Sequence, residues 1–392
     1  MSSAQHGFTI CKSTVTNILS CDAVIASTIM EGHAYGIISF DFKAAFDKVP
    51  HKAVIEALAA KGVSGAALSW YGSFLSGRTQ KVKVGNSLSC SSDVISGVVQ
   101  GSCCGPGLYT LVADSLLQRI RLPHWAFADD FKIVADVAEY SCATVQEEID
   151  KVVQWSDVNQ MPLTIEKCGV MHCGSSQPRF TYFIQNRSMT VFEFDLGLVR
   201  TTGSMYEGHC QAAAAKASKI SGAIRRIFQK KSPQLLWPAY CSYVLPILMY
   251  GSQAWNTTMR KDVRCIESVQ RRYTKSIHGM YNLTYDEKLL QLNALNLENR
   301  RIYADMTFTY KVLHCLIKCT ADELGLRLVH SRTRGDGVRL MQTRAVKRAA
   351  ADIYCIRAPS VWNKLPLTIT NSSSLCMFKS KLRRYLFSKQ ST

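Results

Sequence analysis

Apolar runs of strand length and helical patterns alternate along the first half of the chain. Residues 34–40 (AYGIISF) are apolar and end at Asp41, and a helical pattern begins at Lys43. The stretch 124–136 predicts a strand, a tight turn at residues 128–130 and a second strand. Further strands are expected at 164–173 and 180–196, and helices at 51–61, 64–75, 105–120 and 142–159.

Residues 79–84 (TQKVKV) alternate between polar and apolar positions, and a turn at residues 85–86 (Gly-Asn) separates them from the apolar stretch 93–99. This pair predicts a β-hairpin. Helices mixed with short, mostly antiparallel strands predict an α+β fold for this half of the chain.

After about residue 205 the pattern becomes helical. The segment 207–229 predicts an amphipathic helix with an apolar face at Ile220, Ile224, Ile227 and Phe228. A second stripe of the same helix carries the cations Lys216, Lys219, Arg226 and Lys230. Further helices are expected at 233–249, 259–277, 284–293, 297–318 and 373–386, with a polar, basic loop at 319–343.

The charge of the chain is concentrated in its second half. The 392 residues carry a formal net charge of +18, of which residues 1–199 contribute −3 and residues 200–392 contribute +21. Such a basic half is typical of a protein that binds a polyanion. A basic surface that is merely solvated remains the alternative.

Asp129 and Asp130 are adjacent carboxylates between two apolar runs, an arrangement that is costly unless something neutralises them. A β-α-β-β arrangement of the strands would bring Asp41 beside the same turn. Three carboxylates at strand ends suit two divalent cations roughly 3.5–4 Å apart that serve a phosphoryl transfer, and Mg²⁺ prefers oxygen ligands. A solvated turn is the alternative for an isolated Asp-Asp pair.

Other kinds of site find little support in the sequence. The 15 cysteines are irregularly spaced and follow no secretory signal, so we expect mostly reduced thiols in an intracellular protein. The Cys/His groups at 168–173 and 314–319 lack the paired spacing of a structural zinc site. No P-loop, dinucleotide-binding or Gly-x-Ser-x-Gly motif occurs. No apolar stretch reaches membrane-spanning length, and no membrane partner is expected.

Several motifs in order carry a family resemblance. They are FDFKAAFDKVPH (40–51), SGVVQGSCCGPGLYTLVADSL (96–116), FADD (127–130) and WSDVNQMPLTIEKCGVMHC (155–173). In this order and at these spacings the chain resembles the reverse transcriptase of LINE-type (non-LTR) retrotransposons, nearest to the jockey-like group. The resemblance continues more weakly through DLGLVR (195–200), IRRIF (224–228), VLPILMYGSQAW (244–255), IESVQRRYTK (266–275) and VWNKLP (361–366).

The resemblance implies an α+β right-hand polymerase palm with partial fingers, followed by a helical thumb and a basic, mostly helical C-terminal region. The implied boundaries are 1–200 for the reverse transcriptase domain, 201–295 for the thumb and 296–392 for the C-terminal region. The implied function is RNA-directed DNA polymerisation by two-metal nucleotidyl transfer onto a primer 3′-hydroxyl. The implied partners are an RNA template, a DNA primer, their RNA–DNA hybrid, deoxynucleoside triphosphates and two Mg²⁺ ions. Target-primed synthesis would place the protein in the nucleus.

The family's catalytic residues match positions in this chain. Asp41, Asp129 and Asp130 match its metal-binding aspartates, and Phe42 would add a backbone carbonyl. Lys167 matches the lysine thought to assist the pyrophosphate leaving group, although the lysine alone reads as a solvated side chain.

The family's nucleotide-binding residues also have counterparts. Phe46 matches the bulky residue beneath the sugar that favours deoxynucleotides, although periodicity alone favours ordinary core packing for it. Gln100 and Gly101 match the Gln-Gly that lies against template and incoming nucleotide, and Phe127 begins the FADD motif. In the thumb, the expected nucleic-acid-binding residues are Lys216, Lys219, Arg226, Lys230, Arg271, Arg272 and Lys275, which would contact the backbone.

The sequence also departs from the family pattern. Phe127 replaces the usual tyrosine, and Val99 replaces the usual proline before Gln100. The motif QHGF (5–8) corresponds to a point well inside the family's polymerase domain, so we expect an N-terminally truncated chain that lacks the basic fingers strands. The alternative function is therefore a catalytically impaired retroelement remnant that binds nucleic acid without polymerising.

Overall fold

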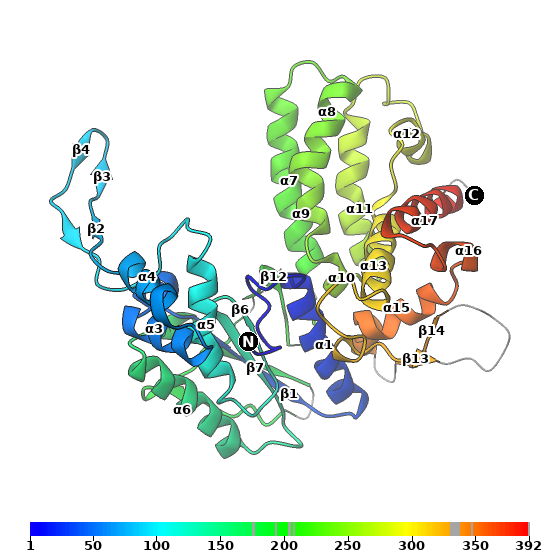
Figure 1. The fold of residues 1–392 in the computed structure, drawn as a ribbon. Helices are drawn as coiled ribbons and strands as arrows, with labels where there is room; N and C mark the ends of the chain where they lie inside the picture. The colour runs from blue at the N-terminus through cyan, green and yellow to red at the C-terminus, as the bar shows by residue number, and fades with distance from the viewer. Residues whose placement is uncertain are drawn as a thin grey trace. The chain divides into compact units, whose positions relative to one another are not determined.

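The computed structural model describes residues 1–174, 177–192, 194–202, 205–206, 208–329, 338–345 and 348–390. The chain divides into two compact units, whose elements are drawn in Figure 1. The first unit holds Met1–Asn17 and His33–Phe192, and the second holds Ile18–Gly32 and Glu193–Thr392. Helix α1 (Thr14–Met30) begins in the first unit and continues into the second.

A four-stranded antiparallel sheet forms the centre of the first unit. Its strands are β1 (Tyr35–Phe40), β6 (His124–Phe127), β7 (Asp130–Asp136) and β8 (Gly169–Cys173). They lie in the order β6-β7-β1-β8, so β1 pairs with β7 on one side and β8 on the other. Every residue of β1 except Ser39 is buried, which explains why this strand is a continuous apolar run rather than an alternating one.

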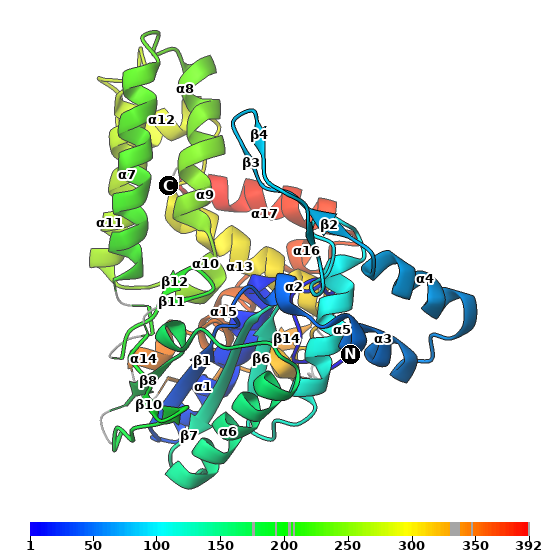
Figure 2. The ribbon, with the colours of Figure 1, turned by 90° about the vertical axis from the view of Figure 1, so that its left-hand side faces the viewer.

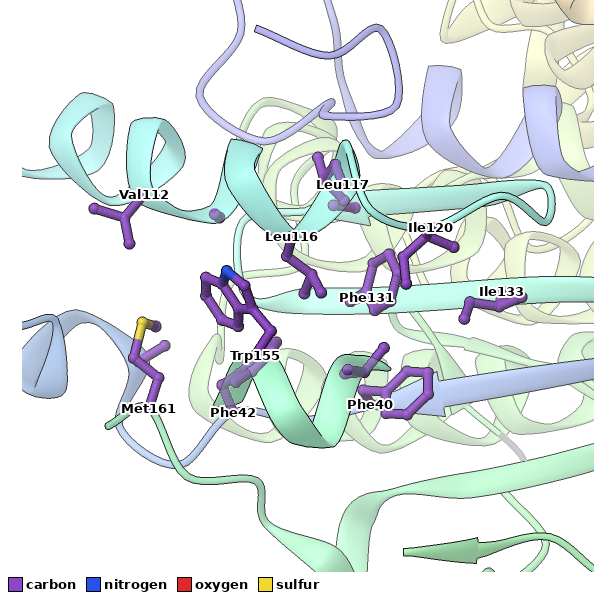
Figure 3. Close-up of a cluster of buried hydrophobic side chains, with 14 of the residues drawn as sticks. Phe40, Phe42, Val112, Leu116, Leu117, Ile120, Phe131, Ile133, Trp155 and Met161 are labelled. Atoms are coloured by element: carbon purple, nitrogen blue, oxygen red, sulfur yellow. The ribbon is translucent and has the colours of Figure 1, made fainter. Parts of the chain in front are cut away.

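Helices α5 (Gly105–Leu117) and α6 (Cys142–Val158) supply the core that covers the sheet. In Figure 2 α6 lies in front of the sheet, and Figure 3 shows Leu116 of α5 and Trp155 of α6 in one buried cluster with Phe131. The rings of Phe40 and Phe131 stack with centroids 5.5 Å apart, and Phe42 meets Trp155 edge-on at 5.7 Å. The strand ends that carry the candidate aspartates are therefore held on a packed base.

Short helices complete the first unit. They are α2 (Ala45–Lys48), α3 (His51–Ala60), α4 (Gly65–Leu75) and the 3-10 turn η1 (Ile165–Lys167). The observed α+β architecture confirms the predicted fold class. Helices α3 to α6 lie within three residues of the predicted ranges.

The predicted β-hairpin is present, but its second arm lies earlier in the sequence than expected, within residues 87–93 rather than 93–99. Strand β3 (Lys83–Val84) pairs with β4 (Ser87–Leu88), and β2 (Thr79–Gln80) pairs with β5 (Ser92–Asp93). The prediction of a strand through residue 99 was wrong. The backbone N–H groups of Gly97 and Val98 instead donate to the carbonyls of Val49 and Phe46, which draws this segment onto α2.

The predicted strand at 180–196 is also divided. Strand β9 (Phe183–Ile184) pairs with β10 (Arg187–Ser188), and Gln185 and Asn186 between them have φ values of 47° and 63°. Strand β11 (Phe194–Asp195) then pairs with β12 (Leu198–Val199) in the second unit. Two left-handed residues reverse the chain, so one continuous strand cannot form.

The second unit is mainly helical, as predicted. Its helices are α7 (His209–Ile227), α8 (Pro233–Ala239), α9 (Leu245–Met249), α10 (Ser252–Trp255), α11 (Arg260–Lys275), α12 (Tyr285–Gln291), α13 (Leu297–Leu313), α14 (Arg348–Ala351), α15 (Tyr354–Trp362), α16 (Leu367–Thr370) and α17 (Leu375–Gln390). A π-helical turn at Tyr240–Val244 joins α8 to α9, between Pro238 and Pro246. Proline lacks an N–H donor, so the regular helical ladder cannot run through this stretch.

The predicted loop at 319–343 is only partly described. It contains the 3-10 turn η3 (Asp322–Leu324) and strands β13 (Leu328–Val329) and β14 (Arg339–Leu340), which pair. Residues 330–337 of this prediction lie outside the described residues. Among the described helices, none has the length and apolar character that a membrane crossing requires.

The predicted apolar face of α7 needs correction. Ile227 is 74% exposed and Ile220 is 37% exposed, whereas Ile224 is buried. The buried face consists mostly of small residues, namely Cys210, Ala213, Ala214, Ala217 and Ser221. Small side chains let α11 pack closely against α7. The positions of the large apolar side chains therefore did not indicate which side of α7 is buried.

A buried ionic cluster lies within the second unit. Arg200 donates from Nη2 to Asp22 Oδ1 at 2.6 Å and from Nε to Asp195 Oδ2 at 2.8 Å, and Tyr206 donates its hydroxyl to Asp22. Burial alone would lower the pKa of Arg200, yet the charge of Asp22 and then those of Tyr206 and Asp195 raise it well above its ordinary value. The cluster joins α1 to the β11–β12 hairpin.

Candidate active site

The register of the sheet brings the three candidate aspartates to one side. Phe40 pairs with Phe131, so Asp41, one residue beyond β1, lies opposite Asp130. Phe127 pairs with Asp130 across the β6–β7 hairpin, which leaves Ala128 and Asp129 as the turn. Carboxylates from distant parts of the sequence thus lie at the same end of neighbouring strands, as the pattern predicted.

The pKa of Asp129 reflects the charges around it. Burial raises the pKa of Asp129, the charge of Asp41 raises it further, and Lys167 opposes both. Lys167, at the end of η1, places Nζ 3.4 Å from Asp41 Oδ2, with its own side chain 67% exposed. Such an exposed pair adds little stability, but it places one cation among the acids.

The carboxylates are not drawn together tightly. Among the described residues, the oxygens of Asp41, Asp129 and Asp130 do not all lie within 4.8 Å of one another. Like charges at this spacing repel, and a divalent cation is the group that would pull them inward.

The backbone around Phe42 is fixed by the segment that precedes Lys167. The Thr164 N–H donates to the Asp41 carbonyl at 2.7 Å, and the Lys43 N–H donates to the Pro162 carbonyl at 2.8 Å. Neither bond uses the Phe42 carbonyl, while the Phe42 ring is buried against Trp155. The segment 162–164, which precedes Lys167, is therefore hydrogen-bonded to the backbone on both sides of Phe42.

Phe46 belongs to an aromatic stack beside the carboxylates. Its ring lies on that of Tyr109 with centroids 4.6 Å apart, and Phe8 meets it edge-on at 5.8 Å. Burial raises the pKa of Tyr109, and the charges of Asp129 and Asp130 raise it further. Since those charges act on Tyr109, the stack lies close to the acidic turn.

Gln100, Gly101 and Phe127 occupy different surroundings. The exposed Gln100 donates from Nε2 to Asp47 Oδ1 at 2.7 Å, and Gly101 has a φ of +79° in the turn before α5. Phe127 is half-buried at the end of β6. No contact joins Gln100 directly to the three aspartates among the described residues.

Gln5, which no sequence pattern singles out, holds the backbone of the acidic turn. Gln5 is 1% exposed. Its Oε1 accepts from the N–H of Ala128 at 3.1 Å and of Gly7 at 2.8 Å, and its Nε2 donates to the Ala128 carbonyl at 3.4 Å. Ala128 has a φ of +58°, a left-handed conformation that costs about 1 kcal/mol or more in an L-residue. Gln5 therefore clamps both sides of the strained residue next to Asp129.

The surrounding segment reaches the same strand. The His6 N–H donates to the Ala126 carbonyl at 2.8 Å, and the Ala126 N–H donates to the Ala4 carbonyl at 2.9 Å. A Cβ on Gly7 would lie 2.2 Å from the Ala128 nitrogen, so only glycine fits. The motif QHGF was visible in the sequence, but no local pattern shows that it packs on a turn more than a hundred residues away.

Six of the candidate nucleic-acid contacts lie on the neighbouring helices α7 and α11 of the second unit, and Lys230 lies just beyond the end of α7. All seven are exposed: Lys216, Lys219, Arg226, Lys230, Arg271, Arg272 and Lys275. Arg272 of α11 donates to Ser218 of α7 at 3.3 Å, Arg271 lies 4.4 Å from the ring centroid of Tyr285, and Lys275 lies 4.8 Å from that of Tyr281. Within the described part of the chain none of the seven forms an ion pair, so the α7–α11 face keeps its positive charge.

A family model described as reverse transcriptase (RNA-dependent DNA polymerase) matches residues 1–201. A Pol polyprotein from the type-1 retrotransposable element R2 of Popillia japonica is 23% identical over 67% of this chain and 46% of its own length. The RNA-directed DNA polymerase from the mobile element jockey of Drosophila melanogaster is 24% identical over 64% of this chain and 29% of its own length. The predicted resemblance to LINE-type reverse transcriptases is thereby confirmed. The chain spans less than half the length of these relatives.

A solved telomerase structure from Candida tropicalis, in complex with a fragment of telomeric RNA, aligns with 98% of this chain and 53% of its own. Its sequence identity is 12% and its TM-score is 0.40. The assignment therefore rests on the family match and on the strand arrangement.

Proposed function

This chain belongs to the reverse transcriptase (RNA-dependent DNA polymerase) family, and we propose that it adds deoxynucleotides to a primer 3′-hydroxyl on an RNA template. The observation that carries the proposal is the meeting of Asp41 with the Asp129-Asp130 turn beside Lys167. Synthesis of this kind at chromosomal DNA would require nuclear access.

The donor set fits divalent metal ions. Carboxylate and carbonyl oxygens are the ligands that Mg²⁺ takes. The charge of Asp41 contributes, after burial, to raising the pKa of Asp129, so positive charge is favoured beside these two carboxylates. Asp41, Asp129, Asp130 and the Phe42 carbonyl would hold two Mg²⁺ ions. When bound, such ions stabilise the charges on the attacking and leaving oxygens of phosphoryl transfer.

The chain's own residues position the reactants. Gln5 and Gly7 fix the turn that presents Asp129, and the bond from Thr164 to the Asp41 carbonyl fixes the opposite strand end. The side chain of Lys167 is 67% exposed, so it would be able to leave Asp41 and meet the negative charge of a departing pyrophosphate. Precise positioning of this kind is a large part of the rate enhancement in two-substrate reactions.

Phe46 selects the sugar. Its ring is backed by Tyr109 and edged by Phe8, so it cannot move aside for a 2′-hydroxyl without losing both contacts. Gln100 and Gly101, in the turn before α5, would lie against the base pair being formed. The exposed cations of the α7–α11 face would hold the hybrid through its phosphates without reading its sequence.

Primer extension tests the proposal. Purified protein is given an RNA template, a DNA primer, deoxynucleoside triphosphates and Mg²⁺, and is compared with Asp129→Asn. The wild type should extend the primer and Asp129→Asn should not. Asp150→Asn, an exposed carboxylate on α6, is the matched control and should extend normally.

The second candidate function, nucleic-acid binding without polymerisation, is favoured by the unpaired cations of the α7–α11 face. It predicts no extension by either protein, together with hybrid binding that weakens steeply as salt rises. Extension by wild type and by Asp129→Asn alike would contradict the assigned metal site.

A further inference from the structure

A groove in the second unit is lined by cations and aromatic rings. It has a volume of about 560 Å³ and lies between α17 and the region of α13. Its cations are Lys379, Arg383 and Arg384, and its aromatic residues are Tyr303 and Phe387. Figure 1 shows α17 beside α13, and the two helices pack extensively. None of the described residues that line the groove is acidic.

The cations form one stripe of an amphipathic helix. Phe378, Leu382 and Leu386 of α17 are buried, and the groove residues follow the same three- and four-residue spacing on the other side of the helix. Packing of the apolar side therefore fixes the direction in which the cations face. The stripe is a consequence of the fold.

The positive charge of the groove is not neutralised. Within the described part of the chain Lys379, Arg383 and Arg384 form no ion pair. The hydrogen-bond acceptors of the two arginines are neutral, since Arg383 donates to the Asn293 carbonyl at 2.7 Å and Arg384 to Ser380 Oγ at 3.2 Å.

A fourth cation adds to the same field. Burial lowers the pKa of Arg300 on α13, and the charge of Arg383 contributes to that lowering. The buried Nε of Arg300 has no hydrogen-bond partner among the described residues. Arg300 does not line the groove, but its charge adds to the positive potential beside Arg383.

We propose that this groove binds the phosphate backbone of single-stranded nucleic acid. Guanidinium and ammonium groups hold phosphates through charge-assisted hydrogen bonds. A positive groove that also offers aromatic faces for stacking is the arrangement by which proteins hold single strands irrespective of sequence. The proposal goes beyond the polymerase function, because it concerns a separate contact that needs neither metal ions nor deoxynucleotides.

Binding of a short fluorescein-labelled oligouridylate, without deoxynucleotides or Mg²⁺, tests the groove. The variant Lys379→Gln/Arg384→Gln removes two of its charges and keeps the bond from Arg383 to Asn293. Each single-strand phosphate contact contributes about 0.7 to the slope of log K against log salt. The variant should therefore lower that slope by about 1.4 and weaken binding roughly 25-fold near 0.1 M salt.

Lys364→Gln/Lys389→Gln is the matched control, since both lysines are exposed and neither lines the groove. It changes the net charge equally and should leave the salt slope close to that of the wild type. Equal losses from both double variants would overturn the proposal, as would a loss confined to blunt duplex.

Photocrosslinking locates the contact directly. With 4-thiouridine in the oligonucleotide, the crosslink should map to the peptides that contain Tyr303 or Phe387, and it should fade in Lys379→Gln/Arg384→Gln. Crosslinks confined to the α7–α11 face would refute the groove as a binding site. Because no synthesis is measured, an inactive polymerase site leaves this test unaffected.

Discussion

Replacing the buried Gln5 with methionine should weaken metal binding at the acidic turn that Gln5 supports. The variant keeps the volume of the side chain and removes its three hydrogen bonds to Ala128 and Gly7. Two N–H groups and one carbonyl are then left without their partner in a buried place. The left-handed Ala128 loses the contacts that offset its strain, and Asp129 is the next residue along the chain.

The size of the effect follows from those bonds. A net contribution of about 1 kcal/mol for each bond gives a loss of roughly 2–3 kcal/mol in the free energy of unfolding. Only the portion of this free energy that holds the turn in its present orientation affects the metal site. If about 1.4 kcal/mol of it does so, the affinity for a divalent cation falls roughly tenfold.

Isothermal titration calorimetry with Mn²⁺ measures the affinity for a divalent cation, and chemical denaturation measures the free energy of unfolding. Gln177→Met is the matched control, because Gln177 donates to the Tyr35 carbonyl at 2.9 Å, at the end of β1 away from Asp41. It should reduce stability without changing Mn²⁺ affinity. Unchanged Mn²⁺ affinity in Gln5→Met, or equal weakening in both variants, would show that Gln5 only stabilises the fold.

Three further outcomes are expected. Phe46→Val should raise incorporation of ribonucleotides relative to deoxynucleotides by at least tenfold in primer extension, and an unchanged ratio would leave Phe46 with a packing role alone. Burial, and then the charges of Lys12 and Lys132, lower the pKa of His6 to about 3. Below about pH 6.5 the unfolded chain therefore binds a proton at His6, whereas the folded chain does not bind it until about pH 3. Stability should therefore fall by about 1.4 kcal/mol per pH unit from about pH 6.5 towards 3 on account of this residue, and His6→Asn should flatten that dependence in denaturation curves. Asp22→Ala should cost about 3 kcal/mol in the stability of the second unit because it leaves Arg200 without its first carboxylate, and a loss below 1 kcal/mol would contradict the assigned cluster.

The sequence was most informative where local pattern decides structure. The apolar run before Asp41 and the hairpin around Asp129 follow from strand patterning, and their meeting follows from the antiparallel register. The helix α1 carried no such signal, because it is buried on nearly all sides and shows no single apolar stripe. The buried side of α7 consists mostly of small residues, with Ile224 as its one isoleucine, because a close helix neighbour selects small side chains.

The residue that supports the acidic turn, Gln5, could not be predicted from the sequence for a different reason. The hydrogen bonds of Gln5 depend on tertiary packing across more than a hundred residues, which neither propensity nor periodicity encodes. The roles of Gln100, Gly101 and the α7–α11 cations stay predictions, since their partners are nucleotides and nucleic acid.

The division of α1 between the two units bears on how the protein can be taken apart. Residues 18–32 belong with the second unit, although they precede the whole of the sheet in sequence. A fragment cut near residue 193 would therefore contain the thumb helices without Asp22, and Arg200 would be left with half of its counter-charge. Independent expression of the helical half requires α1 to be supplied in trans or fused to it. The two units are thus interleaved along the gene, and a single cut does not separate them into modules that can be exchanged.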